Sequence, residues 1–318
     1  MSPDTAHYWR LILIALLLPL VSPGLKAQAP LSQRRVIIDT DIGDDIDDAF
    51  AVALALRSPE LRIAAVVTAW GDTDKRLKIV NRLLHEVGRE DILTAAGVLT
   101  DHKTPDQYPW GARYTAARPE RSDGVALEAQ LLQRYPGEIT LIAIGPLTNL
   151  AALIDQDPAA FRQVREVVMM GGSIHAGYSD YGYGPAHGAQ PEYNIFRDVA
   201  AARKVFQFGV PIRMLPLDAT TMLKLDEFKR ALLFTRSTPL TDSLALLYLL
   251  WDHPTPTLFD PMAVAATVDP SVCPATPLHI DIEDNGLTVD RPDLPPNASA
   301  CLTPHVDQFF RMYMTRVR

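Results

Sequence analysis

The chain has 318 residues, of which 47% are hydrophobic, and its formal net charge at pH 7 is −8. This composition is typical of a globular protein whose buried core belongs to one large domain or two small ones. Lys and Arg form no long run, and nucleic-acid binding needs clustered basic residues. The sequence therefore argues against a nucleic-acid partner.

The first 29 residues have the pattern of an export signal. An apolar run at 11–25 follows basic residues, and the small residues "AQA" at 27–29 fit a signal peptidase site. We predict a signal peptide at 1–29, a mature domain at 30–318, and a periplasmic or secreted location without stable membrane association after cleavage. The alternative is an uncleaved membrane anchor, which two prolines within the apolar run disfavour because they interrupt a helix.

Apolar strand-like segments alternate with helical patterns along the rest of the chain. The strand-like segments lie at 35–39, 61–70, 139–145, 165–172 and 211–218. Segments with helical periodicity lie at 49–57, 74–88, 146–154 and 198–208. The alternation predicts an α/β fold with a mostly parallel open sheet and helices on both faces. Ligands of such sheets bind beyond the carboxyl ends of the strands.

Six aspartates crowd the end of the first predicted strand, at positions 39, 41, 44, 45, 47 and 48. This much like charge destabilises a fold unless a cation neutralises it, or unless some acids are protonated or exposed. No His or Cys lies nearby in the sequence, so the oxygen ligands favour Ca²⁺ or Mg²⁺ over zinc. An EF-hand does not fit, because Gly43 stands where that loop needs a ligand and no Glu closes the loop.

The segment "DTDIGDDIDDAFAV" at 39–52 resembles the signature of the inosine-uridine preferring nucleoside hydrolases. Three more motifs similar to those of this family follow in the same order. They are "AIGPLTNLAAL" at 143–153, "VVMMGGS" at 167–173 leading to "PEYNIFRDVAAA" at 191–202, and "LFDPMAVAA" at 258–266. The resemblance implies a Rossmann-like fold and a Ca²⁺-dependent enzyme that hydrolyses the N-glycosidic bond of ribonucleosides to free base and ribose.

The resemblance also implies a role for each motif residue. Asp41 would ligate the metal and accept the proton of the attacking water, so it is the expected catalytic residue. Asp48, the Thr148 carbonyl and Asp260 would complete the metal site. Thr148 has an alternative role in starting a helix, whereas the apolar surroundings of Asp260 favour the ligand role. The residues expected to bind substrate are Asp45, Asp47, Asp72, Met170, Glu192 and Asn194.

The chain departs from the family pattern at the same site. Ile42 replaces a proline, and two extra residues precede the pair Asp47 and Asp48, so Asp45 competes with that pair for its roles. Phe259 stands where many family members have the histidine that protonates the leaving base. The proton must then come from another group.

Asp72, His175 and His187 are the alternative acids that the sequence offers. Purines can leave after protonation at a ring nitrogen, so we expect purine nucleosides to be preferred over uridine and cytidine. Aromatic faces commonly hold bases by stacking. The tryptophans considered for this role are Trp70, Trp110 and Trp251.

Other functions stay open at this stage. The chain could hydrolyse another N-riboside, or it could be a Ca²⁺-stabilised nucleoside- or sugar-binding protein without turnover, which Phe259 favours. A phosphotransferase is the weakest alternative, because a matching downstream pattern of Lys and acidic residues is missing. A homo-oligomer also stays open. Cys273 and Cys301 could pair in an oxidising compartment or remain two buried thiols.

Overall fold

The computed structural model of the chain describes residues 33–178 and 187–318. The signal peptide expected at 1–29 lies outside the described residues. Within the described ranges, no helix is both long enough and apolar enough to cross a membrane.

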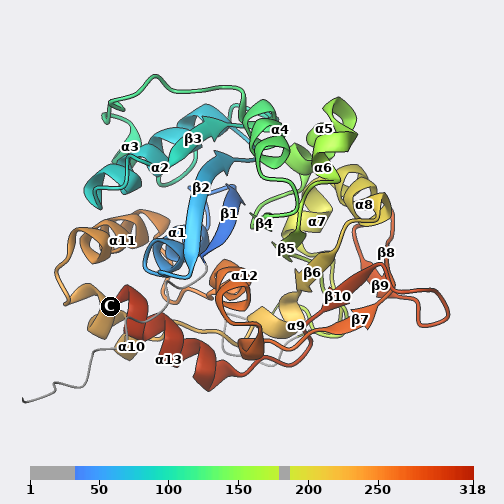
Figure 1. The fold of residues 1–318 in the computed structure, drawn as a ribbon. Coiled ribbons are helices and arrows are strands. Elements are labelled where there is room, and N and C mark those ends of the chain that lie inside the picture. The colour runs from blue at the N-terminus through green and yellow to red at the C-terminus, as the bar shows by residue number, and fades with distance from the viewer. Residues whose placement is uncertain (1–32, 179–186) are drawn as a thin grey trace, which may run out of the picture. The chain divides into compact units, whose positions relative to one another are not determined.

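A sheet of eight strands organises the described part of the chain, in the order β3-β2-β1-β4-β5-β6-β10-β7 (Figure 1). Its strands are β1 (Arg34–Thr40), β2 (Leu61–Thr68), β3 (Leu93–Ala96), β4 (Ile139–Ala143), β5 (Glu166–Met170), β6 (Ile212–Leu215), β7 (Thr276–Leu278) and β10 (Ala298–Ala300). All neighbouring pairs are parallel except β10 with β7. A separate antiparallel hairpin consists of β8 (Ile280–Ile282) and β9 (Thr288–Asp290). The predicted mostly parallel sheet is confirmed.

Side chains of the central strand alternate between two hydrophobic layers. In β1, Val36 and Ile38 belong to one core cluster, and Ile37 belongs to the other. This alternation follows from the period of two in a strand, and it explains why the central strands are apolar on both faces.

Helices cover both faces of the sheet, as Figure 1 shows. The first layer contains α1 (Asp47–Leu56), α2 (Thr73–Glu86), α3 (Tyr108–Gly111), α9 (Leu217–Thr220), α10 (Glu227–Phe234), α11 (Pro239–Trp251), α12 (Phe259–Val268), the 3₁₀ helix η2 (Pro270–Val272) and α13 (Val306–Val317). The second contains α4 (Gly124–Arg134), α5 (Thr148–Gln156), α6 (Pro158–Phe161), α7 (Tyr193–Arg197) and α8 (Val199–Phe208).

Strand order reverses around β1, which pairs in parallel with β2 on one side and with β4 on the other. In open α/β sheets, the crevice beyond the carboxyl ends of strands at such a reversal is where ligands bind. The loop that follows β1 contains the aspartate cluster, so the fold places that cluster at the expected binding edge.

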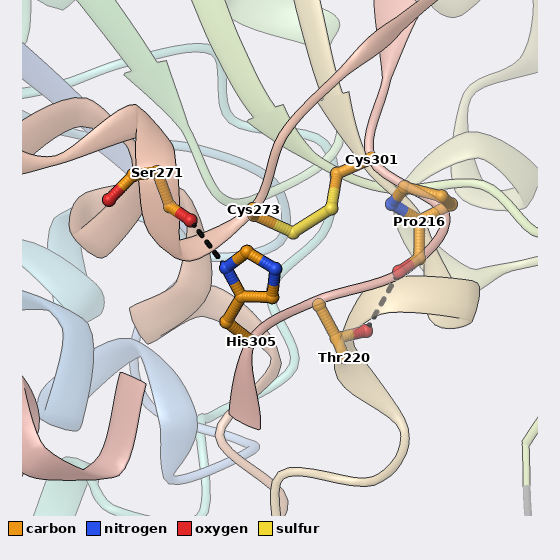
Figure 2. Close-up of a disulfide and its surroundings, with 6 residues drawn as sticks. All are labelled: Pro216, Thr220, Ser271, Cys273, Cys301 and His305. Carbon is orange, nitrogen blue, oxygen red and sulfur yellow. Dashed lines mark hydrogen bonds between the residues drawn. A yellow bond between two sulfur atoms is a disulfide. The ribbon is translucent and has the colours of Figure 1, made fainter. Parts of the chain in front are cut away.

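Cys273 and Cys301 form a disulfide, shown in Figure 2. Cys273 follows η2, and Cys301 follows β10, where its amide donates to the Met214 carbonyl at 3.1 Å. The imidazole Nδ1 of His305 lies 2.8 Å from the Ser271 carbonyl oxygen beside it. The bridge therefore links the chain beyond α12 to the edge of the main sheet, and it resolves the pairing that the sequence left open.

Candidate active site

The acidic loop, defined here as residues 41–48, runs from the end of β1 to the first turn of α1. Gly43 has a φ of +130°, and a Cβ atom built on it would lie 2.8 Å from Cβ of Pro105, so only glycine fits this turn. The Thr40 hydroxyl donates to the Asp48 carboxylate and accepts a bond from the Ile42 amide at 3.1 Å. The turn thus brings Asp48 back under the strand end.

Three buried carboxylates meet at this loop, from Asp47, Asp48 and Asp260. One oxygen from each lies within 4.8 Å of the others, and the residues are only 3–5% exposed. Asp47 and Asp48 begin α1, and Asp260 is in the first turn of α12, which packs against α1. Burial, followed by the neighbouring carboxylates, raises the pKa of Asp48 and Asp260 well above the ordinary value. Such a group could hold a metal ion, because oxygen donors of this kind suit a hard cation.

Asp41 is the first residue of the acidic loop, directly after β1, and it lines the same cavity as the triad. It is 9% exposed, and burial raises its pKa to about 6, while the Arg76 guanidinium opposes that rise. Asp39 lies deeper, fully buried, and one of its carboxyl oxygens accepts a 2.6 Å bond from the Asn149 side-chain amide. Asp41 is thus the more accessible acid at the end of β1.

A cavity of about 310 Å³ opens over the carboxylates. Its acidic lining consists of Asp41, Asp44, Asp45, Asp47, Asp48, Glu192 and Asp260. The other lining residues are Lys103, Ile144, Met170, Tyr178, Tyr193, Asn194, Arg197 and Phe259. Two larger hollows, of about 840 and 830 Å³, contain none of the residues of the acidic loop, so volume alone does not mark the site.

Eight of the residues expected from the sequence line this one cavity. They are Asp41, Asp45, Asp47, Asp48, Met170, Glu192, Asn194 and Asp260. They come from the loop after β1, the end of β5, the start of α7 and the start of α12, all at the carboxyl edge of the sheet. Expected residues from three of the four motifs therefore line one cavity.

Thr148 and Asp72 do not line the cavity. Thr148 starts α5, and its hydroxyl donates a 2.8 Å bond to the Asp198 carboxylate. Ile144, directly after β4, lines the cavity from this connection instead. Asp72 caps α2 by accepting from the Lys75 amide at 3.1 Å, and its carboxylate also pairs with the Lys75 ammonium at 2.8 Å.

Glu192 and Asn194 are held by backbone hydrogen bonds around α7. The Glu192 carboxylate accepts from the amides of Gly172 at 2.8 Å, Asn194 at 3.0 Å and Ile195 at 3.2 Å. Burial raises the pKa of Glu192 to about 7 despite these bonds. The Asn194 side-chain amide donates to the Met170 carbonyl at 3.1 Å. Glu192 therefore both caps α7 and lines the cavity, and Asn194 lines it beside Glu192.

The aromatic wall of the cavity differs from the one expected. Tyr178, Tyr193 and Phe259 line it, and the rings of Tyr178 and Phe259 meet edge to face with centroids 6.0 Å apart. The tyrosines lie in a Gly- and Tyr-rich segment and in "PEYNIF", so clustered aromatics in loops were the available signal.

The expected stacking tryptophans lie elsewhere. Trp110 is buried against the Arg82 guanidinium, and Trp251 packs on Tyr248. Trp70, which has a φ of +58°, is also absent from the cavity lining. The two alternative histidine acids, His175 and His187, are likewise not among the described residues that line the cavity.

Comparison with known proteins agrees with this geometry. The sequence matches the family described as inosine-uridine preferring nucleoside hydrolase over residues 36–311. The pyrimidine-specific ribonucleoside hydrolase RihA of Citrobacter koseri is 35% identical over 198 residues, which are 58% of this chain and 60% of that protein. RihA of Photobacterium profundum is 37% identical over 200 residues, which are 59% of this chain and 61% of that protein. The chain thus matches about three fifths of the length of these relatives.

Solved structures share the fold. The plant nucleoside hydrolase PpNRh1 superposes with a TM-score of 0.76 at 26% identity, covering 89% of this chain and 98% of that one. An inosine-uridine preferring nucleoside hydrolase from Bacillus anthracis gives a TM-score of 0.75 at 19% identity, covering 90% and 99%. Since the family match spans nearly the whole described chain and its motifs converge on one acidic cavity, the chain belongs to the inosine-uridine preferring nucleoside hydrolase family.

Proposed function

We propose that the chain hydrolyses the N-glycosidic bond of ribonucleosides to free base and ribose, with Ca²⁺ as its metal. The observation that carries the proposal is the convergence of buried carboxylates from three motifs on one cavity at the carboxyl edge of the sheet. The names of the relatives support the same activity. A binding protein without turnover is the second candidate, because Phe259 lines the cavity where an acid would assist the leaving base.

Asp41, Asp48 and Asp260 are the proposed side-chain ligands. Asp48 and Asp260 belong to the triad together with Asp47, and Asp41 lines the same cavity. All-oxygen ligation by carboxylates fits Ca²⁺, and a cation would offset the burial and the mutual repulsion that raise the pKa values of Asp48 and Asp260. A carbonyl ligand from the connection after β4 would come from Ile144, which lines the cavity, in place of Thr148.

Asp41 is the proposed general base. When bound, the cation would lower the pKa of the water molecule that attacks the sugar. The Asp41 carboxylate lines the same cavity as the triad, and it would accept the proton of a water molecule that attacks the sugar there. No covalent bond to the protein is needed.

The remaining polar residues fit the ribose. The backbone hydrogen bonds fix Glu192 and Asn194, and Asp47 faces the same cavity. These groups can bind ribose hydroxyls without reorganising, and the carboxylates stabilise the positive charge that develops on the sugar ring.

The base class needs a different proposal from the one that the sequence favoured. The purine preference depended on Phe259 in place of a histidine, on Asp72 and on the tryptophans. Phe259 lines the cavity, but neither Asp72 nor any of the three tryptophans does. The curated relatives quoted above are pyrimidine-specific. We therefore propose uridine and cytidine as substrates, with the base against Tyr178, Tyr193 and Phe259.

The proposal includes export to the periplasm or the medium. The apolar N-terminal segment supports it, and so does the disulfide, because disulfides persist mainly in oxidising compartments.

The test is to incubate the purified mature chain with uridine, cytidine and inosine, with Ca²⁺ or with EGTA, and to measure reducing sugar. Release of ribose that needs Ca²⁺ is expected for the wild type and is expected to be lost in Asp41→Asn. The exposed Asp293→Asn is the matched control, because it removes the same charge far from the cavity lining. Nucleoside binding without ribose release would favour the binding-protein alternative.

A further inference from the structure

Arg76, in α2, is a buried cationic residue beside the acidic loop. Its side chain is 3% exposed, and its Nε donates to the Trp70 carbonyl at 2.8 Å. One terminal nitrogen, Nη1, donates to the carbonyls of Asp41 and, at 3.0 Å, Ile42. The other, Nη2, donates to the Asp44 carboxylate at 2.7 Å. A single guanidinium thus ties the loop after β1 to the loop after β2.

Two glycines with left-handed backbones pack against this guanidinium. A Cβ atom built on Gly43 would lie 3.4 Å from Nη1 of Arg76, and one built on Gly71, whose φ is +65°, would lie 3.1 Å from Nη2. A side chain at either position would crowd the Arg76 guanidinium or strain the backbone. Both loops therefore have a shape that accommodates the guanidinium.

Gln107 fixes the same loop from the opposite side. Its side-chain amide donates to the carbonyls of Asp44 and Asp45, at 3.1 Å each, and its backbone amide donates to the Gly43 carbonyl at 2.8 Å. Protein groups alone therefore satisfy the backbone carbonyls from position 41 to position 45. Hydrogen bonds from Arg76 and Gln107 therefore hold the bend that presents the carboxylates.

Arg76 also supplies charge where the cluster needs it. Its guanidinium favours the ionised forms of Asp41 and Asp48, whose pKa values burial raises. Lys103 lies 3.5 Å from Asp44, but its side chain is 69% exposed and so is more strongly screened by solvent.

We propose that Arg76 is a positioning residue that fixes the acidic loop in its cation-binding shape before the cation binds. The inference rests on the proposed function, because the cation and the reaction belong to it. The planar guanidinium of Arg76 donates to four acceptors in fixed directions, namely three backbone carbonyls and the Asp44 carboxylate, and a lysine ammonium cannot do so. Ligands fixed in advance lose less conformational entropy on binding, so the shape set by Arg76 strengthens cation binding.

The test compares Arg76→Lys with Arg82→Lys. Both positions lie in α2, and both substitutions keep the positive charge, but Arg82 bonds the Trp110 carbonyl and Glu86, away from the acidic loop. Ca²⁺ affinity is measured by titration calorimetry well below the unfolding temperature. We expect Arg76→Lys to weaken Ca²⁺ binding about tenfold or more, as loss of groups that orient metal ligands commonly does, and Arg82→Lys to stay within about twofold of wild type.

A second readout needs neither metal nor substrate. Hydrogen exchange of the amides at 41–48 in the Ca²⁺-free protein should be about tenfold faster in Arg76→Lys and unchanged in Arg82→Lys.

A third readout is kinetic. At saturating Ca²⁺, kcat of Arg76→Lys should fall while its KM for the nucleoside changes by less than about threefold. Lower thermal stability with unchanged Ca²⁺ affinity and unchanged exchange would show a merely structural role and overturn the proposal.

Asp44→Ala decides the matter if Arg76→Lys does not fold. This variant removes one of the guanidinium's four acceptors, at a side chain that is 28% exposed. Positioning by Arg76 predicts faster exchange at 41–48, whereas relief of charge repulsion alone predicts slower exchange, which would overturn the proposal. Because affinity and exchange do not depend on turnover, a wild type without hydrolase activity would refute the proposed function and leave this test valid.

Discussion

The backbone amide of Asp260 donates a 3.2 Å hydrogen bond to the Asp47 carboxylate, although the two residues are 213 positions apart in the chain. The bond joins the first turns of α12 and α1, so two helix starts present their acids to the same point. Each acid is buried. Burial and then the charge of Asp45 raise the pKa of Asp47 despite its hydrogen bonds to Asp260, whereas burial and then the charge of Asp47 raise the pKa of Asp260. This pair favours its ionised form only when a positive charge lies nearby.

Removal of the cation should therefore destabilise the fold. We expect the mature chain to melt at a lower temperature in EGTA than in Ca²⁺, because an ion at 100 times its Kd stabilises the native state by about 2.7 kcal/mol. Thermal melts with Ca²⁺, Mg²⁺ or EGTA measure this. Identical melting temperatures in all three would exclude a bound divalent cation, and equal stabilisation by Mg²⁺ would refute selectivity for Ca²⁺.

Asp41→Asn should separate turnover from binding. The substitution keeps the shape and one oxygen ligand but removes the proton acceptor, so kcat should fall by about 10²–10⁴ while KM changes far less. Steady-state kinetics at saturating Ca²⁺ check this, with Asp293→Asn as the control. A variant that turns over at the wild-type rate would remove Asp41 from the mechanism.

Glu128 gives the stability a pH dependence that is independent of the reaction. It is fully buried in α4, and among the described residues neither of its carboxyl oxygens has a hydrogen-bond partner. Burial, and to a smaller extent Asp39, raises the pKa of Glu128 well above the ordinary 4.5. The folded state then holds a proton that the unfolded state has lost, so stability decreases as pH rises from 4.5 toward the folded pKa.

Glu128→Gln should weaken that pH dependence. The amide resembles the protonated acid, so we expect the variant to be more stable than wild type at pH 8, by about 2–4 °C in Tm, and nearly equal to it at pH 4.5. Thermal melts across this range, all with saturating Ca²⁺, make the comparison. If the difference between variant and wild type does not change with pH, Glu128 does not titrate in this way.

The disulfide should stabilise the segment beyond α12. Cys273 and Cys301 are separated by 28 positions, and losing a bridge of this kind typically costs about 2–4 kcal/mol. We expect the double substitution to Ala, or reduction of the wild type, to lower the melting temperature. The double variant should no longer respond to reductant. A wild type that melts at the same temperature with and without reductant would contradict the prediction and weaken the argument for export.

The sequence predicted the parts of this structure that depend on local pattern. Apolar runs located the strands, and the aspartates at a strand end located the binding edge, because parallel strands place their carboxyl ends together. The resemblance named Asp260, and the cost of burying an acid among apolar residues favoured a ligand role for it, which stays a prediction.

The sequence did not predict features that depend on long-range geometry. The motif "IGPLTN" does not tell which of its residues lines the cavity, and three residues separate Ile144 from Thr148. The sequence alone does not distinguish a tryptophan that packs on an arginine, as Trp110 does on Arg82, from one that stacks on a nucleoside base. Arg76 bonds carbonyls 34 and 35 positions earlier in the chain, which no periodicity reveals.

Phe259 sets the last prediction, which concerns the leaving base. Its ring lines the cavity and meets Tyr178, whose pKa burial raises, so that tyrosine is a poor proton donor. Phe259→His would place a titratable group at this wall. We expect kcat/KM for uridine and inosine to rise, by about tenfold or more, while that for p-nitrophenyl riboside stays within about threefold, because the nitrophenyl group leaves without a proton. Asp72→Asn should change none of the three activities, since Asp72 caps α2 away from the cavity. An equal change for all three substrates in Phe259→His would show that base protonation does not limit this enzyme.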